Sequence, residues 1–159
     1  MINATSISAS RTPFPAEPRS LRPVLPANTL EIRPVSTPFE RRATAALVRR
    51  MYRWRGYQID DRSSAFDDPD SLTIAAWRGD EIAATMMLRR DGAKGLLCES
   101  LYPDEVKQFR AGNRTICEYS RLAVNPEFRS PGLLDTFFLA AYQAARHRFD
   151  ATDALVEVN

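Results

Sequence analysis

A strand, a short loop and a helix between residues 116 and 149 restrict the fold of this chain more than any other feature. Residues 116–124 are mostly β-branched, aromatic or apolar, which is typical of a strand. A polar loop follows, and Ser130 and Pro131 suit the N-cap and the first position of a helix. Apolar residues then recur at helical spacing as far as Phe149. A strand that leads directly into a long amphipathic helix predicts an α/β fold.

A first helix is predicted earlier in the chain. Residues 30–36 alternate apolar and polar side chains, as a half-buried strand does. Thr37 and Glu40 then have the spacing of a capping box, and Pro38 suits the first helical position. The apolar face of this helix continues until Gly56, which can adopt the left-handed conformation that ends a helix.

The middle of the chain predicts a β-hairpin, with strands at residues 71–78 and 81–89 joined by a tight turn at Gly79–Asp80. Residues 103–111 predict a short helix, and residues 154–158 predict a last strand. The expected order is therefore strand, helix, three strands with a small helical insert, helix and strand.

The length of 159 residues indicates one folded domain, which we expect to span residues 30–159. Residues 1–29 contain five prolines, which exclude a regular helix or a central strand. We expect this segment to be a disordered or weakly docked arm rich in proline and serine.

Composition argues against several function classes. A formal net charge of +2 is too small to indicate a nucleic-acid partner. Cys98 and Cys117 lack metal-ligand spacing, and His147 is the one histidine, so neither a metal site nor a Ser-His-Asp triad is expected. No apolar segment is long enough to span a membrane. Two reduced cysteines fit a cytoplasmic protein.

The turn from Arg129 to Leu133 is a candidate phosphate site. Free N–H groups at a helix N-terminus and the helix dipole both favour an anion. Gly132 allows a ligand to approach the backbone, and Arg129 adds a positive charge. The alternative is that Ser130 caps the helix and occupies the same N–H groups.

Glu118 is unusual because it lies inside an otherwise apolar and aromatic strand. It can form a structural ion pair with Arg121, or it can face a wet cleft as a general base. The two residues point to opposite faces of a regular strand, so a bulge would be needed to bring them together. If the strand at 122–124 separates from its neighbour, its main-chain N–H groups become free to bind a ligand.

The order of these elements resembles the GNAT acyltransferase fold. More closely, the chain resembles the long-chain N-acyl amino acid synthases, which are relatives of the acyl-homoserine-lactone synthases. The segments that carry the resemblance are Tyr52–Tyr57, Leu97–Val106 with Phe109–Gly112, Glu118–Val124 and Thr152–Asn159. The resemblance implies a mixed central sheet with helices on both faces.

The resemblance also implies transfer of a fatty acyl group from an acyl-carrier thioester to the amino group of an amino acid. The donor is acyl carrier protein (ACP) or a coenzyme A (CoA) thioester, used as a co-substrate, with no tightly bound cofactor. The implied catalytic residues are Glu118 and Arg121. The implied donor-binding residues are Leu122, Ala123, Val124, Arg129, Ser130, Gly132 and Leu133. The implied acceptor-side residues are Arg55, Tyr57 and Asp67.

Three departures from the family pattern stand out. Met87 occupies a position at which the homoserine-lactone synthases carry an arginine, and Leu134 replaces the last glycine or alanine of the GNAT phosphate motif. The sequence also stops at Asn159, where the family continues into a further helix and strands. We therefore expect a C-terminally truncated version of the fold, as a shortened product, a fragment or one half of a homodimer.

Two other functions remain open from the sequence. One is an acetyl-CoA-dependent acetyltransferase of the same fold. The other is an inactive remnant that binds a carrier protein or a partner strand.

Overall fold

The computed structural model describes residues 29–57 and 67–156. The elements in these ranges are β1 (Glu31–Pro34), α1 (Pro38–Trp54), β2 (Ser71–Arg78), β3 (Glu81–Arg90), η2 (Leu97–Ser100), α2 (Pro103–Ala111), β4 (Ile116–Val124), η3 (Pro126–Phe128), α3 (Leu133–Phe149) and β5 (Asp153–Val156). Most of the predicted N-terminal arm, part of the loop after α1 and the end of the predicted last strand lie outside the described residues.

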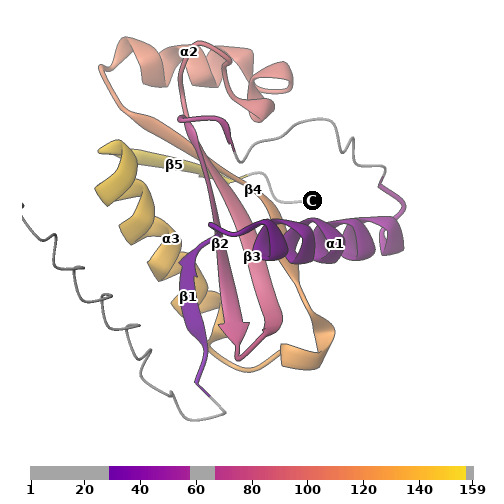
Figure 1. The fold of residues 1–159 in the computed structure, drawn as a ribbon. Helices are drawn as coiled ribbons and strands as arrows, with labels where there is room; N and C mark the ends of the chain where they lie inside the picture. Colours follow the sequence, from indigo (N-terminus) through magenta and orange to yellow (C-terminus); the bar gives the residue numbers. More distant parts are fainter. Residues whose placement is uncertain (1–28, 58–66, 157–159) are drawn as a thin grey trace, which may run out of the picture.

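The strands form one sheet in the order β1-β2-β3-β4-β5 (Figure 1). Neighbours from β1 to β4 run antiparallel, and β5 runs parallel to β4. The chain reaches β5 through α3, as a parallel connection requires. The α/β fold with a mixed sheet, expected from the sequence, is thereby confirmed.

Helices cover both faces of the sheet (Figure 1). On one face, Phe137 of α3 joins the main core around Met86 and Tyr119. On the other face, Leu47 of α1 packs with Ala123 in a separate cluster. Full burial of a side chain as large as Phe137 contributes about 1.5–3 kcal/mol. A third cluster attaches η2 and α2 to the start of β4.

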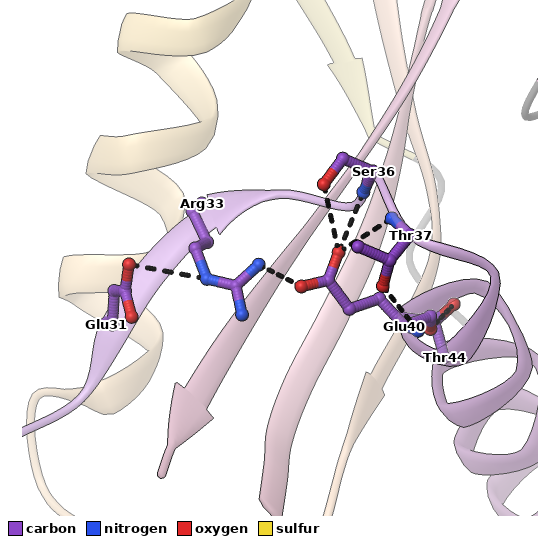
Figure 2. Close-up of polar contacts among 6 residues, drawn as sticks. All are labelled: Glu31, Arg33, Ser36, Thr37, Glu40 and Thr44. Atoms are coloured by element: carbon purple, nitrogen blue, oxygen red, sulfur yellow. Dashed lines mark hydrogen bonds and ion pairs between the residues drawn. The ribbon is translucent and has the colours of Figure 1, made fainter. Parts of the chain in front are cut away.

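The start of α1 confirms the predicted capping box. The Thr37 hydroxyl accepts the N–H of Glu40, and the Glu40 carboxylate accepts the N–H of Thr37 (Figure 2). Glu40 also accepts the N–H of Ser36 at 2.8 Å and pairs with Arg33 of β1. These contacts connect β1 to α1 and fix the direction in which the helix leaves the sheet.

The local predictions from β1 to β4 agree with the structure, including the hairpin of β2 and β3 and the helix α2. The end of α1 also agrees, because Gly56 follows the helix with a φ of +82°. The start of α3 was predicted wrongly. The helix begins at Leu133, after a left-handed Gly132, and Ser130 is not its cap.

None of the helices in the described ranges has both the length and the apolar character needed to cross a bilayer.

Candidate functional site

A cavity of about 570 Å³ opens between the end of α1, the second half of β4 and the start of α3. The residues that line it are Met51, Tyr52, Arg55, Leu122, Ala123, Val124, Arg129, Ser130, Pro131, Leu133 and Leu134. Three segments that are distant in the sequence therefore meet at one site.

The β4 wall of the cavity follows a β-bulge. Thr85 of β3 pairs with Ala123, and Met87 pairs with Ser120, so two residues of β4 lie opposite the single residue between them on β3. Arg121 lies in the bulge with a φ of +53°, in the left-handed region. A bulge shifts the alternation of a strand by one residue, which explains why Ala123 faces α1.

In the part of the chain that the structure describes, β5 covers only the first half of the other edge of β4. β5 pairs with β4 only from Ile116 to Tyr119. Within the described residues, no strand pairs with that edge after Tyr119. Among the described residues, the main-chain polar groups of this edge beyond Tyr119 have no strand partner, which is the condition under which the sequence predicts that they bind a ligand.

The start of α3 offers main-chain donors to the same cavity. Its N-cap is Gly132, with a φ of +80° and no side-chain capping hydrogen bond. The N–H of Leu133 donates to the Ser130 carbonyl at 3.2 Å, which leaves the next N–H groups of the first turn outside the helix ladder. The space beside Gly132 is open to 4 Å. Since no side chain caps the helix, the structure favours the anion-binding interpretation of this turn.

The charges of the cavity agree with an anionic ligand. Two of the described lining residues are charged, Arg55 at the C-cap of α1 and Arg129 in the loop before α3, and both are cations. Among residues 29–57 and 67–156, no carboxylate lines the cavity. The other walls are largely apolar and include Met51, Leu122 and Leu134. A ligand that suits this site has an anionic group and an extended apolar part.

Glu118 lies on β4 but does not line the cavity. It is 2% exposed, and its carboxylate oxygens accept the N–H groups of Leu97 at 2.8 Å and Cys98 at 2.7 Å. The carboxylate therefore holds the first turn of η2 against β4, a role that neither sequence interpretation included. Arg121 is also absent from the lining of the cavity.

Of the three residues expected on the acceptor side, one lines the cavity, one lies next to a lining residue and one lies away from the cavity. Arg55 lines the cavity. Tyr57 packs on Tyr52, with ring centroids 6.0 Å apart, and reaches the cavity only through that contact. Asp67 pairs with Arg41 at 3.0 Å, near the opposite end of α1. Arg41 precedes Tyr52 by eleven positions in the helix, or about 16 Å along its axis, so Asp67 lies away from the cavity.

Three of the described lining residues lie outside the segments predicted for the site, namely Met51, Tyr52 and Leu134, whereas Pro131 belongs to the predicted turn from Arg129 to Leu133. Met51 has a usable signal, since it precedes Arg55 by one helical turn and shares its side of α1. Leu134 was named as a departure from the GNAT phosphate motif, and 44% of its surface is exposed.

The two cysteines are unsuited to nucleophilic catalysis. Cys117 is fully buried, and burial raises the pKa of its thiol to about 12. Cys98 is buried in the cluster under α2. Neither thiol lines the cavity, so a covalent cysteine intermediate has no support there.

The sequence model of the N-acyl amino acid synthase FeeM family matches residues 43–159. The solved structure of FeeM, an N-acyl amino acid synthase from uncultured soil microbes, is similar with a TM-score of 0.74 and 23% identity. The similarity covers 82% of this chain and 74% of that one. No curated protein sequence is significantly similar.

More distant structures share the fold. An aminoglycoside acetyltransferase from an uncultured soil metagenomic sample has a TM-score of 0.59 and 12% identity, over 82% of this chain and 78% of that one. The glucosamine-6-phosphate N-acetyltransferase of Arabidopsis thaliana has a TM-score of 0.56 and 11% identity, over 82% and 83%. Because the family model covers most of the sequence, this chain belongs to the FeeM family of N-acyl amino acid synthases and is an acyltransferase with a GNAT-like fold.

Proposed function

We propose that this protein transfers a fatty acyl group from a carrier thioester to the amino group of an amino acid. The observation that carries the proposal is the cavity, which joins apolar walls to an uncapped helix N-terminus and two arginines. A phosphate-bearing carrier with an acyl chain has both features that this cavity selects. The family assignment supports the same reaction.

The donor binds with its phosphate at the start of α3. There the N–H groups beyond Gly132 donate to phosphate oxygens and Arg129 pairs with their charge. The apolar arm and the acyl chain lie along Leu122, Val124 and Leu134. Both ACP and CoA supply a phosphate and a thioester, so the cavity suits either donor.

The acceptor enters from the side of α1, where Arg55 pairs with its carboxylate. The neutral amine attacks the thioester carbonyl. A C–N bond forms, the C–S bond breaks, and the carrier leaves as a thiolate that takes up a proton. Main-chain N–H groups on the open edge of β4 stabilise the oxyanion of the intermediate.

The proton of the attacking amine passes to water in the open cavity, because none of the described residues that line it carries a carboxylate. Glu118 acts as a positioning residue, since both of its oxygens already accept main-chain N–H groups. Arg121 acts in the same way, by forming the bulge that sets the β4 wall. The resemblance implies instead that Glu118 is a general base. The variant Glu118→Gln distinguishes a general base from a positioning residue.

The test is to incubate the protein with acyl-ACP and acyl-CoA donors and a pool of amino acids, and to detect products by mass. We expect N-acyl amino acids with long-chain donors. The matched variants are Leu122→Trp, which narrows the cavity, and Leu139→Trp, at an exposed position of α3 that does not line the cavity. Absence of product from the folded protein, or equal activity of both variants, contradicts the proposal.

Acetyl transfer is the second candidate, because acetyltransferases share the fold. Comparing acetyl with long-chain donors separates the two reactions, since an acetyltransferase turns over the acetyl donor at least as well as the long-chain donor. We further propose a cytoplasmic location, which fits two buried cysteines that are not joined by a disulfide. Analytical sedimentation of the purified protein tests whether it forms a homodimer. Carrier binding without any product would identify an inactive binding protein.

A further inference from the structure

The outer face of α1 carries a row of exposed arginines. Arg42, Arg50 and Arg53 are exposed and recur at helical spacing, so they share the side of the helix that faces away from the sheet. Phe39 lies on this side in the first turn of α1. Trp54 lies next to the same side in the last turn. We call these five residues the arginine row.

Within residues 29–57 and 67–156, no acid neutralises the charges of the arginine row. Among the described residues, none of its arginines forms an ion pair. The acid of α1, Glu40, is buried and turned toward Arg33. Asp67 pairs with Arg41, which is not part of the row. Three positive charges are therefore presented together on one surface.

The two aromatic side chains at the ends of the row are unusually exposed. Phe39 is 56% exposed and Trp54 is 74% exposed. Fifteen positions separate them, which is about 22 Å along a helix. Exposed aromatic residues combined with arginines are typical of surfaces that lie in the headgroup region of a bilayer.

We propose that the arginine row docks the protein on an anionic lipid bilayer. The arginines contact lipid phosphates, while Phe39 and Trp54 enter the interface between headgroups and acyl chains. A straight row of this length suits a flat surface better than the compact pocket in which a protein partner would enclose Trp54. Met51 and Tyr52 line the cavity from other sides of α1, so docking leaves the cavity accessible.

The test is co-sedimentation with phosphatidylcholine vesicles, with and without phosphatidylserine. We expect binding to the anionic vesicles only, weakened by high salt. Tryptophan emission gives a second readout. Trp77 is 1% exposed and Trp54 is 74% exposed, so a blue shift on binding reports Trp54 leaving water. The shift should disappear in Trp54→Phe.

A charge-matched pair of double variants tests the location. Arg42→Gln with Arg53→Gln should weaken binding to anionic vesicles about thirtyfold, from roughly fivefold for each basic residue near the surface. Lys107→Gln with Arg148→Gln removes the same charge from exposed positions of α2 and α3 and should retain binding. Circular dichroism confirms that each variant is folded.

Three outcomes overturn the proposal. The first is no binding of the intact protein to anionic vesicles, and the second is an equal loss of binding in both double variants. The third is that the α1 variant retains vesicle binding but loses turnover with a carrier-protein donor, which would identify the row as a surface for an acidic protein. Vesicle binding needs no turnover, so this proposal and the proposed reaction can fail separately.

Discussion

Glu40 provides the most direct test of the forces that hold α1 in place. Glu40 is only 5% exposed, and burial alone would raise the pKa of its carboxyl group. The N–H groups of Ser36 and Thr37 and the guanidinium of Arg33 outweigh burial and lower the pKa from 4.5 to about 2 (Figure 2). The perturbation is Glu40→Gln, which keeps the shape and removes the charge.

The expected magnitude follows from the two pKa values. A group that binds its proton more weakly in the folded state stabilises that state above its unfolded pKa. This stability is lost as the pH falls toward the folded pKa. For Glu40 the stabilisation is about 3 kcal/mol at neutral pH, declines below about pH 4.5 and is nearly gone at about pH 2. Glu40→Gln should therefore cost about 3 kcal/mol at pH 7 and much less at pH 3.

The assay is urea unfolding followed by circular dichroism at several pH values between 7 and 3. The control is Thr37→Ala, which removes the neutral half of the capping box and should cost about 1 kcal/mol at every pH. If Glu40→Gln costs the same at pH 7 and pH 3, the carboxylate is not held as an anion by these contacts, and the reasoning is wrong.

Three further predictions concern the site. Glu118→Gln should lower the free energy of unfolding by about 2 kcal/mol by weakening the contacts with η2, and retain turnover of the folded enzyme; intact stability with abolished turnover would instead identify a general base. Arg129→Gln should raise the KM for the donor about tenfold with little change in kcat, whereas Arg148→Gln, at the other end of α3, should not. Arg121→Gly should be more stable to urea than Arg121→Ala by about 1 kcal/mol, because the φ of +53° favours glycine; the opposite order would argue against a left-handed residue there.

Features decided within a few residues were predictable from the sequence. The capping box needs only the spacing of Thr37 and Glu40, and the hairpin needs only the turn at Gly79 between two apolar runs. Both depend on local hydrogen bonds that the rest of the fold does not alter. The segment from Leu122 to Val124, which lines the cavity, was expected at the site from family resemblance, and its role in donor binding stays a prediction.

Features decided by a competing local turn or by distant contacts were not predictable. Ser130 has the type and position of a good N-cap, but the turn from Ser130 to Leu133 places Gly132 in that role instead. The sequence predicted that Glu118 either forms an ion pair or faces a wet cleft. Its partners are instead the N–H groups of η2, about twenty residues earlier in the chain. The residue types around Ser130 do not indicate the turn, and those around Glu118 do not indicate a contact with η2.

The bulge in β4 explains why a regular alternation could not locate the site. Before the bulge, Glu118 faces η2, and Tyr119 faces the core that α3 covers. An uninterrupted strand would then place Ala123 on the face of Tyr119, toward α3. The bulge at Arg121 reverses this order, so Ala123 packs against α1 instead. The wall that meets the end of α1 and the start of α3 thus depends on one residue in a left-handed conformation, which the side-chain pattern alone does not reveal.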